Sequence, residues 1–304
     1  MPKPLVLIFF AAAFYFFTET RLPAVHKPAL STEGIVHASA EFTKARLDED
    51  ETENVTVLTR SNFRPFVASL YQEMGLSELG LDADVFEKAM TGYYSLEGEG
   101  TLRKGNLLTI IDFGKASTEK RFYTIDLEDR RVLYHTYVAH GRNTGDNLAS
   151  EFSNVAHSNQ SSLGFYVTAE TYYGSKGYSL RLDGLEESFN DKIRSRAIVV
   201  HGAHYVTESW IKRYGRLGRS QGCPALPPDL NKEIIDAIKG GTVMFAYYPE
   251  PHYLNASRYL DIDRLFDRLD EKPLPVAGVF PSLKSFVTVR AGPTDAGHSH
   301  KCLP

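Results

Sequence analysis

The apolar residues of this 304-residue chain change their period at Gly105, from about 3.6 residues before it to about 2 residues after it. A period near 2, in runs rich in Val, Ile, Tyr and Phe, is typical of β-strands. The fold is therefore predicted to be mainly β (α+β), with a polar hairpin turn at 128–131. The six β-rich runs cover 107–113, 121–127, 132–139, 164–168, 197–200 and 243–248.

Two polar connections between these runs are too long for simple hairpins. They cover 142–162 and 171–196. Long loops on a sheet scaffold are where binding and catalytic residues usually lie. We therefore expect the functional site to lie near these loops.

Helical periodicity marks three stretches outside the β-rich part. It predicts helices over 63–74 and 86–94, with Asp84 as the N-cap of the second helix and an end before 97–100. A third helix is predicted over 260–269. The aromatic stripes of the first two helices are interpreted as core, because no polar residues are interleaved with them at ligand spacing.

The N-terminus is typical of an exported protein. Lys3 precedes an unbroken apolar run from residue 5 to residue 17. As a helix this run is only about 20 Å long, whereas the hydrocarbon core of a membrane is about 30 Å thick. An export signal or short membrane anchor is therefore predicted over 1–20. The alternative, that the apolar run is a buried first helix, is disfavoured. The chain is expected in the periplasm or cell envelope, where an uncleaved N-terminus can tether it to the membrane.

Charge and cysteine content exclude several function classes. The 34 Lys and Arg residues nearly balance the 38 Asp and Glu residues, which gives a net charge of −4 and disfavours a nucleic-acid partner. Two cysteines are too few for a disulfide-rich scaffold or a four-cysteine zinc module. There is no glycine-rich phosphate loop in the sequence.

The residues with catalytic chemistry lie between His201 and Cys223. An apolar strand delivers His201 and Gly202 at its end, and Ser220-Gln221-Gly222-Cys223 follows after a loop. A thiol becomes a nucleophile at neutral pH when an imidazole accepts its proton or holds it as a thiolate beside an imidazolium. Gly222 permits a close approach of the backbone, so N–H groups of Gly222 and Cys223 are candidates to face a developing oxyanion.

Other residues compete for these roles. His204 and His140 are rival candidates for the base. Ser220 is disfavoured as a nucleophile beside a thiol and is expected to position the turn.

The C-terminal tail offers two competing interpretations. Cys302 can pair with Cys223 as a structural disulfide in an exported protein, which would mask the nucleophile. The tail residues His298, His300 and Cys302 resemble a metal-ligand set only superficially, and a solvated end is favoured.

The paired motifs His201-Gly202 and Ser220-Gln221-Gly222-Cys223 resemble those of the murein L,D-transpeptidase catalytic domain family, the YkuD-like enzymes. The resemblance covers about 105–250, and implies a β-sandwich catalytic domain that follows a short helical region. The expected organisation is an export signal or anchor (1–20), a linker (21–62), a helical region (63–104), the catalytic domain (105–250) and a C-terminal extension (251–304). Further segments that carry the resemblance are 122–127, 132–141, 162–166, 177–182 and 215–220.

The resemblance implies roles for individual residues. Cys223 would attack the carbonyl of the third residue of a peptidoglycan stem peptide and expel the terminal D-alanine, with His201 as base and then acid. The carbonyl of Gly202 would orient the imidazole ring, and Ser220 and Gly222 would shape the turn. Stem peptides would be donor and acceptor, and neither a metal nor an organic cofactor is required.

One departure from the family pattern concerns substrate recognition. Many members have Arg or Asn two residues after the cysteine, where this chain has Ala225. Arg219 or Arg216 is therefore the expected partner of a substrate carboxylate. Two alternatives stay open, namely an L,D-carboxypeptidase, in which water accepts the acyl group, and a catalytically silent cell-wall-binding domain.

Overall fold

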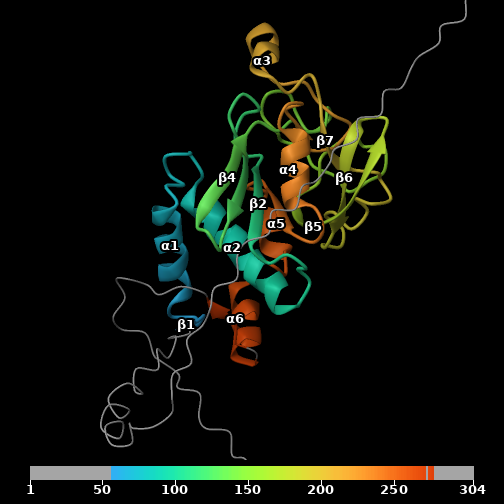
Figure 1. Ribbon diagram of the computed structural model, residues 1–304. Helices are drawn as coiled ribbons and strands as arrows, with labels where there is room; N and C mark the ends of the chain where they lie inside the picture. Colours follow the sequence, from blue (N-terminus) through green and yellow to red (C-terminus); the bar gives the residue numbers. More distant parts are fainter. Residues whose placement is uncertain (1–55, 272, 277–304) are drawn as a thin grey trace, which may run out of the picture. The chain divides into compact units, whose positions relative to one another are not determined.

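The β-rich runs form one mixed sheet in the order β4-β3-β2-β9-β5-β6-β7-β8. Figure 1 labels β4, β2, β5, β6 and β7 of this sheet. The computed structural model describes residues 56–271 and 273–276. A parallel pair, β2 and β9, occupies the middle of the sheet. The strands are β2 (Leu107–Asp112), β3 (Phe122–Asp126), β4 (Arg131–Thr136), β5 (Gly164–Gly174), β6 (Gly177–Gly184), β7 (Val199–Gly202), β8 (Ala225–Leu226) and β9 (Val243–Tyr247).

The hairpin turn predicted at 128–131 joins β3 to β4. Asp126 Oδ1 accepts hydrogen bonds from the backbone N–H groups of Glu128 and Asp129, both at 3.1 Å. An aspartate that caps backbone donors two and three residues ahead is a common way to fix a turn. The prediction of a hairpin here is confirmed.

The chain segment that follows the edge strand β4 pairs with the region of the opposite edge strand, β8. Isolated bridges join Ala139 to Ala225 and Gly141 to Ser220, so the segment that follows β4 contacts the region of β8. The connection brings the catalytic motif at 220–223 against the chain that follows β4. The predicted mainly β (α+β) fold with an N-terminal helical region is confirmed.

Three helices pack together beside the sheet: α1 (Phe63–Glu73), α2 (Ala83–Gly98) and α6 (Ile262–Glu271). Phe63 of α1 meets Phe266 of α6 edge to face, with ring centroids 5.7 Å apart. Helix α2 also contacts β2 and β9 (Figure 1). Its Gly92 lies on the Phe165 ring, where an added Cβ would be 2.0 Å from a ring carbon. The aromatic stripes are therefore core, as predicted.

The start and end of α2 differ from the prediction. The N-cap is Asp82 rather than Asp84, because Asp82 has extended backbone angles and its side chain accepts a hydrogen bond from the Asp84 N–H. Asp84 itself lies in the first turn of the helix. The helix also continues to Gly98, two residues into the predicted break.

Several elements were not predicted. Strand β6 lies inside the connection 171–196, where it forms a hairpin with β5. The two-residue strands β1 (Thr56–Val57) and β10 (Pro275–Val276) pair with each other, although most of the described sequence lies between them. The other unpredicted elements are the two-residue strand β8 and three short helices: α3 (Glu208–Tyr214), α4 (Asn231–Ile238) and α5 (Pro251–Ala256).

Some predictions fall outside the described residues. They concern the apolar N-terminal run, most of the linker, Cys302 and the histidines of the tail. Among residues 56–271 and 273–276, no helix is both long and apolar enough to cross a membrane. The described residues belong to one compact unit, Glu53–Pro304. The finer division into domains stays a prediction.

Candidate active site

Neighbouring strands position the predicted base and nucleophile. Strands β7 and β8 run parallel, with His201 opposite Ala225, and Cys223 lies two residues before β8. The His201 N–H also contacts the Pro224 carbonyl at 3.4 Å. His201 and Cys223 consequently line the same cavity, which has a volume of about 450 Å³.

The Cys223 thiol is half-buried against β7. Its Sγ accepts a hydrogen bond from the Val199 N–H at 3.5 Å. Burial raises the pKa of the Cys223 thiol above its ordinary value of 9.0, although the Val199 N–H and the charges of Lys176 and Arg196 act in the opposite direction. The resting form at neutral pH is therefore the thiol, which needs a base before it can attack.

The His201 ring is oriented by its neighbour in the chain. Nδ1 lies 2.9 Å from the Gly202 carbonyl oxygen, which can only accept a hydrogen bond. Nδ1 therefore carries the proton, and Nε2 is left as the basic atom. Burial lowers the pKa of His201 below 6.5, and the charge of Lys176 lowers it further. His201 is thus neutral at neutral pH and ready to accept a proton.

Ser220 holds the turn that carries the nucleophile. Its hydroxyl donates to the Cys223 carbonyl at 2.6 Å and accepts from the Gly222 N–H at 3.1 Å. Gly222 has a φ of +117°, and an added Cβ would lie 2.8 Å from the Gln160 carbonyl oxygen. Glycine is therefore required at this position for both its conformation and its size.

The backbone donors of this turn are not equivalent. The Gly222 N–H is already bonded to Ser220 Oγ, so it is occupied in this conformation. Within the described part of the chain, the Cys223 N–H has no hydrogen-bond partner. Of the two amides considered for the oxyanion, only that of Cys223 is available without a rearrangement.

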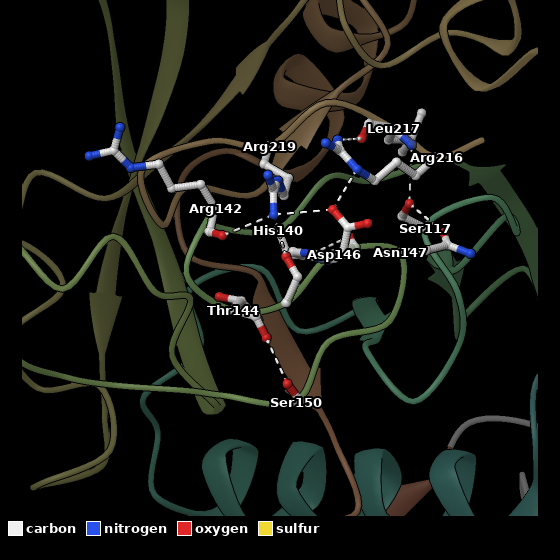
Figure 2. A network of polar contacts seen from close by, with 11 residues as sticks. Ser117, His140, Arg142, Thr144, Asp146, Asn147, Ser150, Arg216, Leu217 and Arg219 are labelled. Atoms are coloured by element: carbon white, nitrogen blue, oxygen red, sulfur yellow. Dashed lines mark hydrogen bonds and ion pairs between the residues drawn. The ribbon is translucent and has the colours of Figure 1, made fainter. Parts of the chain in front are cut away.

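The two arginines expected to bind substrate are held by Asp146 (Figure 2). Arg216 Nε lies 2.6 Å from the Asp146 carboxylate, and Arg219 Nη1 lies 3.2 Å from it. Arg219 also donates to the carbonyls of Arg142 and Gly145. Arg219 lines the cavity, whereas Arg216 does not. Arg219 makes all of these contacts through Nη1, and Arg216 also donates from Nη1 to the Leu217 carbonyl, so both guanidinium groups are held in place.

The rival histidines are placed elsewhere. His140 Nδ1 accepts from Arg121 at 2.8 Å. Its Nε2 donates to the Asp146 carbonyl at 3.1 Å, and both residues are labelled in Figure 2. Burial, followed by the charge of Arg121, lowers the pKa of His140 to about 3. His204 packs edge-on against Tyr205 and Trp210. Neither His140 nor His204 lines the cavity that contains Cys223.

The two long connections supply much of the cavity wall. Arg142, His157 and Asn159 come from the first connection, and Ser175 and Lys176 come from the second. The loop lengths indicated the right segments, but no local signal singled out these residues. Within the described part of the chain, no group of three or more His, Cys, Asp or Glu side chains is placed to hold a metal ion.

Comparison with known proteins identifies the family. The sequence model of the protein family described as the L,D-transpeptidase catalytic domain matches residues 77–247, more than half of the chain. The chain belongs to this family. The match includes His201, Cys223 and the turn between them.

The solved structures that match this chain share little sequence with it. An L,D-transpeptidase from Mycobacterium smegmatis is 13% identical with a TM-score of 0.30, over 47% of this chain and 59% of that chain. The helical cell shape determining protein Pgp2 from Campylobacter jejuni is 12% identical with a TM-score of 0.36, over 60% and 63%. An L,D-transpeptidase from Xylanimonas cellulosilytica is 16% identical with a TM-score of 0.28, over 60% and 93%. No curated protein matches the chain. The chain therefore spans less than two thirds of the length of the first two of these structures.

Proposed function

We propose that this protein is a peptidoglycan L,D-transpeptidase in which Cys223 is the nucleophile and His201 is the general base. Family membership supports the reaction class. The observation that carries the proposal is the locked tautomer of His201, whose Nδ1 is held by the Gly202 carbonyl while the ring lines the cavity of Cys223.

The first half-reaction forms a thioester. His201 Nε2 accepts the thiol proton as Cys223 Sγ bonds to the carbonyl carbon of the third residue of the donor stem. The negative charge on the carbonyl oxygen faces the Cys223 N–H. When the C–N bond breaks, His201 Nε2 gives its proton to the departing amine of D-alanine.

The second half-reaction releases the enzyme. His201 Nε2 takes a proton from the amine of an acceptor stem, and the amine nitrogen bonds to the thioester carbonyl carbon. The S–C bond breaks, and the proton returns from Nε2 to Cys223 Sγ. If water replaces the amine, the same residues produce a carboxypeptidase. Both reactions place the protein in the cell envelope, which agrees with its export-like N-terminus.

The test is release of D-alanine from a stem tetrapeptide, with and without an acceptor amine. Wild type should release D-alanine and form a cross-linked product, and hydrolysed donor alone would identify a carboxypeptidase. Cys223→Ala should abolish release, and His201→Ala should slow it by about 10²–10⁴-fold. His204→Ala is the matched control and should retain activity. A folded wild type with a free thiol that binds the peptide but releases nothing would contradict the proposal and favour a binding domain.

A further inference from the structure

The catalytic cavity has a strongly one-sided charge. Four Lys and Arg residues line it, and its described lining includes no Asp or Glu. The whole chain, in contrast, has a net charge of −4. A cavity whose charged lining residues are all cations attracts an anionic ligand. This attraction is stronger in a partly closed site than at an open surface.

Two of the four cations already have partners. The Arg219 guanidinium is bound to Asp146 and two carbonyls. Arg196 is half-buried against the first long connection and holds it in place. Its hydrogen-bond acceptors are the carbonyls of Ser153 and Gln160 and the hydroxyls of Ser158 and Ser162. Both arginines are therefore structural parts of the wall.

Arg142 is one of the two remaining cations. Its backbone is fixed to the catalytic turn, because its N–H donates to the Ser220 carbonyl at 2.8 Å and its carbonyl accepts from Arg219. Its guanidinium has neither a hydrogen bond nor an ion pair within the described residues, and it extends away from the Asp146 network in Figure 2. A rigid backbone with an unpaired guanidinium is suited to ligand binding.

Lys176 is the second lysine or arginine of the cavity lining whose charged group has no partner among the described residues. It lies in the two-residue turn of the β5–β6 hairpin, which is closed by the Gly174–Gly177 pair. Strand β6 pairs with β7 through Ser179 and His201, so the hairpin turn is positioned beside the catalytic strand. The charge of Lys176 acts on both Cys223 and His201. Its ammonium has no hydrogen-bond or ion-pair partner among the residues that the structure describes.

We propose that Arg142 and Lys176 bind the carboxylates of the acyl donor, including the C-terminal carboxylate of the departing residue. This assignment rests on the proposed function for the identity of the donor. It replaces Arg219 and Arg216, whose guanidinium groups are held by Asp146, as the residues that recognise substrate charge. The substrate class is an anionic peptide with a free C-terminus.

Binding can be measured without turnover in the Cys223→Ala background. The probes are a stem tetrapeptide that ends in D-alanine and the same peptide with a C-terminal carboxamide, titrated by calorimetry. Loss of a charge-assisted hydrogen bond weakens binding by about tenfold. We therefore expect Arg142→Gln and Lys176→Gln each to weaken tetrapeptide binding by about tenfold, and the double variant by more. The double variant should no longer distinguish the acid from the amide.

The controls separate charge from folding. Arg142→Lys keeps the charge and should keep most of the affinity. Arg103→Gln removes an exposed cation that lines a different cavity, and should bind as the parent does. Thermal unfolding of every variant checks that the fold is intact.

The outcomes distinguish this proposal from the proposed function. Unchanged affinity in the double variant, or no binding of the tetrapeptide to the parent, overturns the assignment of Arg142 and Lys176. If the same two substitutions in a protein that keeps Cys223 leave kcat/KM for the donor at the wild-type value, the transpeptidase proposal stands and the assignment fails. If the tetrapeptide binds through Arg142 and Lys176 but wild type releases no D-alanine, the assignment stands and the transpeptidase proposal fails.

Discussion

At the scale of single residues, the protonation states of Cys223 and His201 determine how the reaction begins. Burial shifts the two pKa values apart, upward for the thiol and downward for the imidazole. A thiolate–imidazolium pair requires the opposite order of pKa values. The structure therefore favours a neutral resting pair, in which the proton moves to His201 Nε2 only as the bond to the substrate forms.

The pH dependence of the two groups follows from these shifts. Because the pKa of His201 is lowered, acylation should lose activity only on acidification below pH 6.5. Because the pKa of Cys223 is raised, its alkylation by iodoacetamide in the His201→Ala variant should rise with a midpoint above pH 9.0. An alkylation midpoint below neutral pH in wild type would show a resting thiolate and contradict the neutral pair.

Ser220 is the residue on which the geometry of the turn depends. Ser220→Ala leaves the Gly222 N–H and the Cys223 carbonyl without their partner, and should reduce the free energy of unfolding by about 1–3 kcal/mol. Displacement of the thiol should also slow acylation by about 10–100-fold. Denaturant unfolding and acylation rates measure the two effects.

The matched control is Ser195→Ala, since this hydroxyl is exposed and donates to the nearby Lys192 carbonyl. It should behave as wild type in both measurements. Ser220→Ala with normal acylation would show that the hydroxyl does not position the nucleophile.

At the scale of elements, the sequence predicted the strands and helices that have a regular apolar period. It missed β6, which begins and ends at a glycine and in which three apolar residues alternate with polar ones, because this short pattern lies inside a polar connection. Its pairing with β7 buries residues that a local pattern does not mark, such as Ser179. The β1–β10 pair was not predictable either, because two residues carry no periodicity and the partners are far apart in the chain.

Helix α6 is predicted to be essential for stability. The Phe266 side chain is 1% exposed and packs against Phe63 of α1. Phe266→Ala should reduce the free energy of unfolding by about 3–5 kcal/mol, because it removes a buried ring and leaves a cavity. Denaturant unfolding provides the measurement. Asp270→Ala, on the exposed face of the same helix, should change it by less than about 0.5 kcal/mol. Equal effects of the two substitutions would show that α6 is not packed on the fold.

At the scale of the whole molecule, the candidate site was predictable only in part. The motifs at His201 and Cys223 were readable because they are local in sequence, and the structure brings the two residues to one cavity. The residues proposed to recognise the substrate were not predictable from the sequence, because the proposal depends on the ion pairs that Asp146 makes with Arg216 and Arg219. That pairing joins loops about seventy residues apart in the sequence, and no periodicity or spacing encodes it.

The most direct test of the account is the intact mass of the reduced protein after incubation with a carbapenem, whose β-lactam carbonyl stands in for the scissile peptide. We predict a single covalent adduct on wild type and on His204→Ala. The adduct should be absent from Cys223→Ala and should form at least about 10²-fold more slowly on His201→Ala. A folded wild type with a free thiol and no adduct, or an adduct that persists in Cys223→Ala, would contradict the assignment of the nucleophile.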